Sequence, residues 1–323
     1  MTDSFPAGLP DWPLFGFGDD ARPALRLARQ GGEPLALATI VALDGGGPRP
    51  VGTQMTITAS AVSGFLSGGC LEGDVVVHAA AVLADGAPRR LVYGEGSPWP
   101  DIRLLCGARI EVLLERLTPD DAATATLLDL TDARRPALWL SDGTRRACGS
   151  VETPPESWQG AFARRHDPVC RLIVLGSDPT ALAMAALGAQ AGCETTLVRP
   201  RGPTEPPPLP GVAYSRAEPA AALEAIGLDP WTAVAVATHD AELDHAALAR
   251  ALPSAAFYVG ALGARRRLPD RQTWLAAAGL AEADIARLRA PIGLDIGGKA
   301  PWEVAIAVMA EITAERNRDV SPR

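Results

Sequence analysis

The second half of the chain alternates short apolar runs with helical stretches, and this alternation constrains the fold more than any other feature. The apolar runs are separated by segments with helical patterning, in the order 172–175, 179–191, 194–198, 220–226, 233–238, 243–252 and 255–259. Repeated strand–helix–strand units build a parallel sheet through right-handed crossovers. We therefore predict an α/β protein in which residues 170–323 form a Rossmann-like parallel-sheet domain, closed by a helix at 301–316.

The first half shows short strands and helices without that regular alternation. Expected strands lie at 35–43, 54–58, 62–66, 90–93, 109–114, 137–140 and 146–151, and expected helices at 21–30, 71–84 and 120–132. This pattern predicts an α+β domain over residues 21–152. The Pro/Gly-rich residues 1–20 are expected to be poorly ordered, and the Pro-rich, polar stretch 153–169 is expected to be a linker.

Composition excludes several classes of protein. The 323 residues are 47% hydrophobic and 21% charged, which suits packed cores in two domains. A net charge of −8 argues against nucleic acid or an anionic membrane as partner. The chain has no apolar run of about 18 residues and no signal-peptide pattern, and its five cysteines are scattered. These features predict a cytoplasmic protein with reduced thiols, no membrane partner and no nucleic-acid partner.

One cysteine lies in a glycine turn at a predicted helix start. Cys70 follows Gly68 and Gly69, and free amides at a helix N-terminus and in a glycine nest favour an anion. Such a position also favours a thiolate over a thiol, although the nearby charge of Glu72 opposes this. The alternative is a tight strand-to-helix turn with a small buried cysteine.

A second glycine turn contains Cys106 and Gly107, directly before a predicted strand. A buried core cysteine is the simpler interpretation, and a functional one requires the fold to bring Cys106 near Cys70. Neither cysteine has a CxxC partner or a nearby histidine to complete a zinc site.

Two further loops carry candidate anion ligands. Arg49 lies in the stiff loop 47–54, which ends at Gln54, and its planar guanidinium could clamp a phosphate or carboxylate. An exposed loop arginine is the alternative. Lys299 lies in a glycine-rich turn before the last helix, where phosphate binding and simple helix capping are both compatible with the sequence.

The turn after the first strand of the second domain departs from the dinucleotide fingerprint. Gly176 and Ala181 match its first and last positions, but Asp178 replaces the middle glycine and Arg199 replaces the usual acidic ribose ligand. A carboxylate at that place repels a pyrophosphate, so NAD(P) is not the expected cofactor. An NAD(P)-dependent oxidoreductase with an atypical Rossmann site stays open as the alternative function.

Four titratable residues cluster after the third strand of this domain, and they could suggest a metal: His239, Asp240, Asp244 and His245. We favour the simpler interpretation, in which Asp240 caps the next helix and the other side chains are solvated.

Taken together and in order, these motifs resemble the XdhC/CoxI family of xanthine dehydrogenase accessory proteins. The resemblance covers most of residues 35–312 and rests on the segments 49–52, 67–73, 106–107, 172–175, 238–240, 258–263 and 291–297. Three motifs differ from the common family pattern, at Ala108, at Ala264 and at the Asp178–Pro179 pair.

The resemblance implies a cofactor-binding chaperone rather than a catalyst. Such a protein binds molybdenum cofactor and delivers it, in sulfurated form, to a xanthine-dehydrogenase-type molybdoenzyme, with a cysteine desulfurase as second partner. Cys70, supported by Cys106, would contact the molybdenum end. Arg49 or the Lys299 turn would hold the phosphate tail. The full candidate set is Arg49, Gln54, Gly68, Gly69, Cys70, Glu72, Cys106, Gly107 and Lys299.

Other functions stay open beside this one. Cys70 and Cys106 could instead serve a thiol-redox or metal sensor. A nucleotidyltransferase is less favoured, because no carboxylate pair for Mg²⁺ accompanies a phosphate loop. The sequence does not fix the oligomeric state, and a homodimer is compatible with it.

Overall fold

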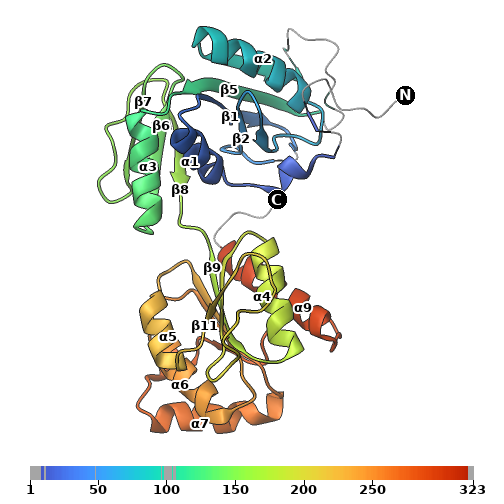
Figure 1. Ribbon diagram of the computed structural model, residues 1–323, viewed down its shortest axis with the longest axis vertical. Helices are drawn as coiled ribbons and strands as arrows, with labels where there is room; N and C mark the ends of the chain where they lie inside the picture. The colour runs from blue at the N-terminus through green and yellow to red at the C-terminus, as the bar shows by residue number, and fades with distance from the viewer. Residues whose placement is uncertain are drawn as a thin grey trace. The chain divides into compact units, whose positions relative to one another are not determined.

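The chain divides into two compact units, Met1–Pro168 and Val169–Arg323 (Figure 1). The computed structural model describes residues 9–10, 12–47, 49–95, 97, 104 and 107–318. Each unit has its own hydrophobic core.

The first unit is built on a five-stranded sheet in the order β3-β2-β1-β5-β4, and every neighbouring pair is antiparallel. Side chains alternate across the sheet, so that Ala38 and Ile40 of β1 face helix α2 while Leu35 and Leu37 face α1 and α3. The elements are α1 (Arg22–Gly31), β1 (Leu35–Asp44), β2 (Gln54–Ile57), β3 (Val62–Gly64), α2 (Glu72–Asp85), β4 (Arg89–Tyr93), β5 (Arg109–Leu117) and α3 (Ala122–Asp132).

A three-stranded antiparallel sheet, in the order β7-β6-β8, completes this unit. Its strands are β6 (Ala137–Ser141), β7 (Arg146–Ser150) and β8 (Phe162–His166). Strand β8 therefore lies inside the stretch 153–169 that the sequence predicted to be a linker. The strand escaped prediction because its more buried positions, Phe162, Arg164 and His166, include two basic residues.

The N-terminal stretch also differs from its prediction where the structure describes it. Residues Leu14–Phe17 form a short 3-10 helix, η1, instead of the poorly ordered segment expected over residues 1–20. Phe15 packs against the core of the first unit, with its ring centroid 6.4 Å from that of Phe65.

The second unit confirms the predicted Rossmann-like domain. Its six strands are all parallel, in the order β11-β10-β9-β12-β13-β14, which is the strand order 3-2-1-4-5-6 of doubly wound sheets. The strands are β9 (Arg171–Gly176), β10 (Glu194–Val198), β11 (Val212–Ser215), β12 (Thr232–Ala237), β13 (Tyr258–Ala261) and β14 (Leu288–Arg289).

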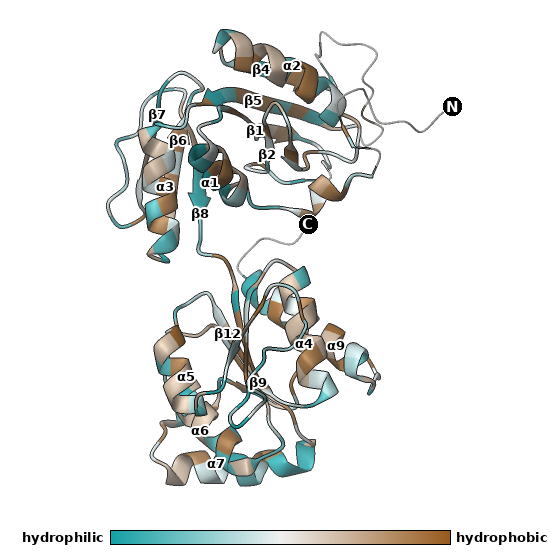
Figure 2. Cartoon of the chain, viewed as in Figure 1, coloured by the Kyte–Doolittle hydropathy of each residue, from teal (hydrophilic) through white to brown (hydrophobic). Residues whose placement is uncertain are grey.

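Helices cover both faces of this sheet. Apolar side chains of α4 and α9 pack on one face, and those of α5, α6, α7 and α8 pack on the other (Figure 2). The helices are α4 (Pro179–Gln190), α5 (Pro219–Ile226), α6 (Ala241–Ala251), η2 (Arg265–Arg267), α7 (Leu268–Ala277), α8 (Glu282–Ile285) and α9 (Pro301–Arg316). The sequence did not predict β11, α7, α8 or β14. Among the described helices, none combines the length and the apolar character needed to span a bilayer.

Candidate functional site

Three connections of the first unit meet at one end of its five-stranded sheet: the β1–β2 loop, the β3–α2 turn and the β4–β5 connection. Asp44, the last residue of β1, pairs with Arg109, the first residue of β5. Gly64, the last residue of β3, pairs with Met55 near the start of β2. The fold therefore places the loop of Arg49, the turn of Cys70 and the turn of Gly107, which are far apart in sequence, at the same sheet end.

The Cys70 thiol is exposed at this sheet end. Cys70 is a free cysteine on the turn between β3 and α2, and Gly68 beside it is also exposed. Gly69 has a φ of +94°, a left-handed backbone conformation that favours glycine. The turn thus presents the sulfur to solvent rather than to an apolar interior, and the alternative of a small buried cysteine does not hold.

Glu72 holds this turn in place. Its side chain is 0% exposed, and its Oε1 accepts hydrogen bonds from the Leu66 and Ser67 amides at 2.9 and 2.7 Å. Its Oε2 accepts from the Ser67 hydroxyl at 2.9 Å and from the Leu71 amide at 3.2 Å. The sequence predicted that Glu72 contacts a cofactor. The structure gives it a different role, because the buried carboxylate is fully engaged by the turn that carries Cys70.

The second glycine turn lies beside the β1–β2 loop. A Cβ atom placed on Gly45 would be 3.5 Å from the Cα atom of Ala108 and 3.6 Å from the carbonyl oxygen of Gly107. Gly107 has a φ of +69° and donates its amide to Leu104 at 2.9 Å. Cys106 lies outside the described residues, so its approach to Cys70 stays a prediction.

Arg49 and Gln54 occupy different surroundings. The Gln54 side chain is buried in the sheet, where its Nε2 donates to Thr39 Oγ1 at 3.3 Å and its Oε1 has no partner. Arg49 pairs with Asp19 and faces a cavity of about 350 Å³ that Arg164 also lines. Sequence reasoning missed Arg164. The sequence Phe162–His166 carries no alternation of apolar and polar residues that could have placed Arg164 on the more buried face of β8.

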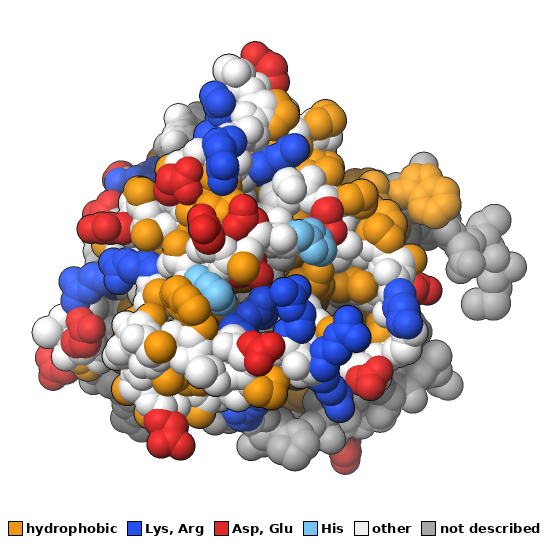
Figure 3. Space-filling model, turned by 90° about the horizontal axis from the view of Figure 1, so that it is seen from below, with side chains coloured by type: hydrophobic (Ala, Val, Ile, Leu, Met, Phe, Trp, Pro, Cys, Tyr) orange, Lys and Arg blue, Asp and Glu red, His pale blue; other side chains and the backbone are white. Residues whose placement is uncertain are grey.

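Lys299 belongs to the second unit and lines a cavity of about 820 Å³ near the carboxyl ends of β12 and β13. Basic, acidic and histidine side chains lie close together on this face of the molecule (Figure 3). The Glu303 carboxylate accepts the amides of Lys299 and Ala300, each at 2.9 Å. These amide bonds lower the pKa of Glu303 and favour the capping interpretation of the turn.

Asp178 fills the place where a dinucleotide fingerprint has its middle glycine. It caps helix α4 by accepting the Ala181 amide at 2.8 Å, and its second oxygen lies 2.9 Å from His239 Nε2. Burial opposes the charge on Asp178, but the bonds from Ala181 and His239 outweigh it and lower the pKa of the carboxyl. A carboxylate that stays ionised at this helix N-terminus disfavours a pyrophosphate there.

The acidic and histidine residues after β12 are structural. Asp240 caps α6 by accepting the amides of Glu242 and Leu243, as the sequence predicted. Asp244, expected to be solvated, is instead buried and paired with Arg271 at 2.9 Å. The ring of His245 stacks on Trp274 with centroids 3.7 Å apart. Within the part of the chain that the structure describes, no group of three potential ligands could hold a metal ion.

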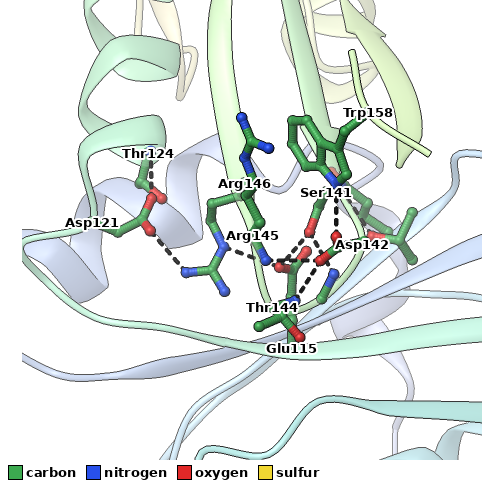
Figure 4. Close-up of polar contacts among 12 residues, drawn as sticks. Glu115, Asp121, Thr124, Ser141, Asp142, Thr144, Arg145, Arg146 and Trp158 are labelled. Carbon is green, nitrogen blue, oxygen red and sulfur yellow. Dashed lines mark hydrogen bonds and ion pairs between the residues drawn. The ribbon is translucent and has the colours of Figure 1, made fainter. Parts of the chain in front are cut away.

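A buried polar network joins the two sheets of the first unit (Figure 4). Glu115 on β5 is 1% exposed and accepts from Ser141 Oγ at 2.7 Å and from Arg146 Nε at 3.1 Å. Arg146 also pairs with Asp121 at 2.8 Å, and Asp121 caps α3 through the Thr124 amide. Each charge in the network has an opposite charge beside it, so the cluster leaves no charge free for a ligand and is not a candidate ligand site.

With this geometry established, comparison with known proteins identifies the family. Residues 28–94 match the model of the XdhC and CoxI family, and residues 172–312 match that of the XdhC Rossmann domain. The chain is 30% identical over 304 residues to the molybdenum cofactor insertion chaperone PaoD of Escherichia coli, covering 92% of this chain and 89% of PaoD. The chain belongs to the XdhC and CoxI family.

Other relatives agree with this membership. One, from Bacillus subtilis, is described as a probable xanthine dehydrogenase component and is 27% identical over 320 residues, which cover 88% of this chain and 94% of the relative. The crystal structure of a xanthine dehydrogenase from Bacillus halodurans has the same fold, with a TM-score of 0.75 at 23% identity, over 94% of this chain and 98% of that one. The Cys70 turn lies inside the XdhC and CoxI match, and the parallel sheet lies mostly inside the Rossmann match.

Proposed function

We propose that this protein binds molybdenum cofactor and delivers it to a xanthine-dehydrogenase-type apoenzyme. The observation that carries the proposal is the exposed Cys70 thiol, held on a fixed glycine turn where three connections meet. The family membership and the name of the relative PaoD, a molybdenum cofactor insertion chaperone, support it.

The chemistry of the cargo fits this end of the sheet. Molybdenum cofactor is an anionic pterin with a phosphate tail and a sulfur-rich metal centre. A soft thiolate suits the metal centre, and amides of a glycine turn suit an anion. Cys70 therefore contacts the molybdenum end, with Cys106 in support, and Gly68, Gly69 and Gly107 leave the turns free of bulky side chains. In this role the protein is a chaperone that holds and releases its cargo without catalysing a reaction.

The cargo has a defined chemical form, and the protein has partners besides the client enzyme. The cofactor is carried in its sulfurated form, and a cysteine desulfurase supplies the sulfur. Delivery takes place in the cytoplasm, and the protein acts as a homodimer. Co-purification with a candidate molybdoenzyme, followed by identification of the bound pterin, tests the client and the cofactor form together.

The test of the site is to load cofactor onto the wild type and onto Cys70→Ser, and to measure the pterin retained after gel filtration. We expect Cys70→Ser to lose most of the bound cofactor, because a hydroxyl is a poor ligand for a soft metal centre. Cys148→Ser is the matched control, since Cys148 lies on β7 and burial raises the pKa of its thiol to about 12. Equal retention by Cys70→Ser and the wild type would remove Cys70 from the site.

A second candidate, an NAD(P)-dependent oxidoreductase, is favoured by the strand order of the second unit and by the cavity near its strand ends. The Asp178 carboxylate opposes this function, because it disfavours a pyrophosphate at the start of α4. Titration with NADH and NADPH tests this alternative, and micromolar binding would favour it over the chaperone.

A further inference from the structure

A small cavity in the first unit lies between the β1–β2 loop and strand β8. Its volume is about 350 Å³, and its walls come from three segments of the chain: Asp19, 49–53 and 162–165. Its arginine lining suits an anionic group, such as a phosphate or a carboxylate. Three arginines line it, Arg49, Arg164 and Arg165, against the single carboxylate of Asp19.

Arg164 has no direct ion pair among the described residues, and only the nearby charges of Asp19 and Asp20 stabilise its cation. It donates a hydrogen bond to the Gly52 carbonyl oxygen. Partial burial lowers the pKa of its guanidinium to about 10, so the group remains charged at neutral pH. A partly desolvated cation without a directly paired carboxylate is unfavourable, and an anion in the cavity would offset that cost.

Arg49 faces the same cavity with one nitrogen unused. Its Nε is buried and has no hydrogen-bond partner, whereas its Nη2 pairs with Asp19. The Asp19 side chain is 70% exposed, so water can solvate it once it leaves Arg49. Arg165 differs from Arg164, because it is already paired with Asp167 at 2.7 Å.

We propose that Arg49 and Arg164 form a binding site for a phosphate monoester, and that Asp19 is an internal competitor that occupies Arg49 when the site is empty. Two guanidinium groups, one from the β1–β2 loop and one from β8, provide several charge-assisted donors, which matches a tetrahedral dianion. Building on the proposed function, the phosphate tail of the cofactor is the ligand that the site takes. Free inorganic phosphate has the same chemistry, and the experiment below separates the two.

The first arm measures binding of inorganic phosphate by calorimetric titration at constant ionic strength. We expect Arg164→Gln to weaken phosphate binding by about tenfold or more, because one charge-assisted donor group is lost. Asp19→Asn should instead tighten binding several-fold, because it removes the competing carboxylate. This gain cannot result from misfolding, so the arm stays informative even if Arg164→Gln folds poorly.

Arg135→Gln is the control, since Arg135 is also an arginine of the first unit but pairs with Glu152 away from the cavity. Its phosphate affinity should equal that of the wild type. Unchanged binding in Arg164→Gln, or weaker binding in Asp19→Asn, would overturn the site.

The second arm measures retention of molybdenum cofactor by the same variants, with and without excess inorganic phosphate. We expect Arg164→Gln to release cofactor faster than Arg135→Gln, and added phosphate to speed release from the wild type. If phosphate binds at this site but retention depends on Cys70 alone, the assignment of the cofactor tail is wrong while the proposed function stands. If even the wild type retains no cofactor, the proposed function fails, and the phosphate titration still decides the anion site.

Discussion

At the scale of single residues, the Glu72 carboxylate determines how the Cys70 thiol is presented. A buried carboxylate that accepts three backbone amides and one hydroxyl fixes the path of residues 66–71. The buried Leu66 and Ser67 amides depend on Glu72 for their hydrogen bonds, whereas the Leu71 amide also donates to Ser67 Oγ at 3.2 Å.

We expect Glu72→Ala to lower the free energy of unfolding by about 2–5 kcal/mol, because it leaves several buried donors without a partner. Chemical denaturation of the purified variant measures this loss. Glu152→Ala is the matched control, since Glu152 is exposed and its ion pair with Arg135 should contribute no more than about 1 kcal/mol. An unfolding free energy for Glu72→Ala equal to that of the control would show that the turn does not depend on the carboxylate.

The sequence allowed part of this site to be predicted. The glycine pattern around Cys70 indicated a turn at a helix start, and the structure has that turn with the thiol exposed. The partners of Glu72 could not be predicted, because they are backbone amides whose directions depend on the turn itself. Arg164 was missed for another reason: its burial follows from the pairing of β8 with β6, which local hydropathy does not reveal.

At the scale of elements, the Glu115–Arg146–Asp121 network connects β5 of the larger sheet to β7 of the smaller sheet and to the start of α3. We expect Arg146→Met to lower the free energy of unfolding by about 3–5 kcal/mol, because it leaves the buried Glu115 charge unpaired. Adding Glu115→Gln should recover part of the loss. A double variant no more stable than Arg146→Met would contradict this account.

The same pair of variants should differ in its response to pH. Burial raises the pKa of Glu115, and removal of Arg146 raises it further, so the folded single variant binds a proton more readily than its unfolded chain. Its stability should therefore fall relative to the wild type as pH rises from about 5 to about 8, whereas the Glu115→Gln double variant should show no such fall. Unfolding curves at both pH values check this.

The regular strands and helices of the second unit were predictable because apolar runs of parallel strands are continuous and helices separate them. The exceptions were short or polar. Strand β14 has two residues, and helix α7 has a single buried side chain, Leu275, so neither produces a clear periodic pattern.

At the scale of the whole molecule, each unit has its own core, and we expect two separable unfolding transitions in calorimetry. Arg146→Met should lower the midpoint of one transition. Gly188→Val should lower the other, because a Cβ on Gly188 of α4 would lie 2.4 Å from Leu172 Cδ2 on β9. A single transition that both substitutions shift equally would show that the units unfold together.

The Asp19–Arg49 pair determines which anions can bind at Arg49. A carboxylate carried on the same chain is always present near Arg49, at an effective concentration of about millimolar order. Weakly bound solutes such as chloride or acetate, offering one charge, gain little by displacing it. A ligand that also binds Arg164 gains a second contact when it displaces Asp19 from Arg49. Competition from the Asp19 carboxylate therefore weakens the binding of small monovalent anions more than that of a ligand that contacts both arginines.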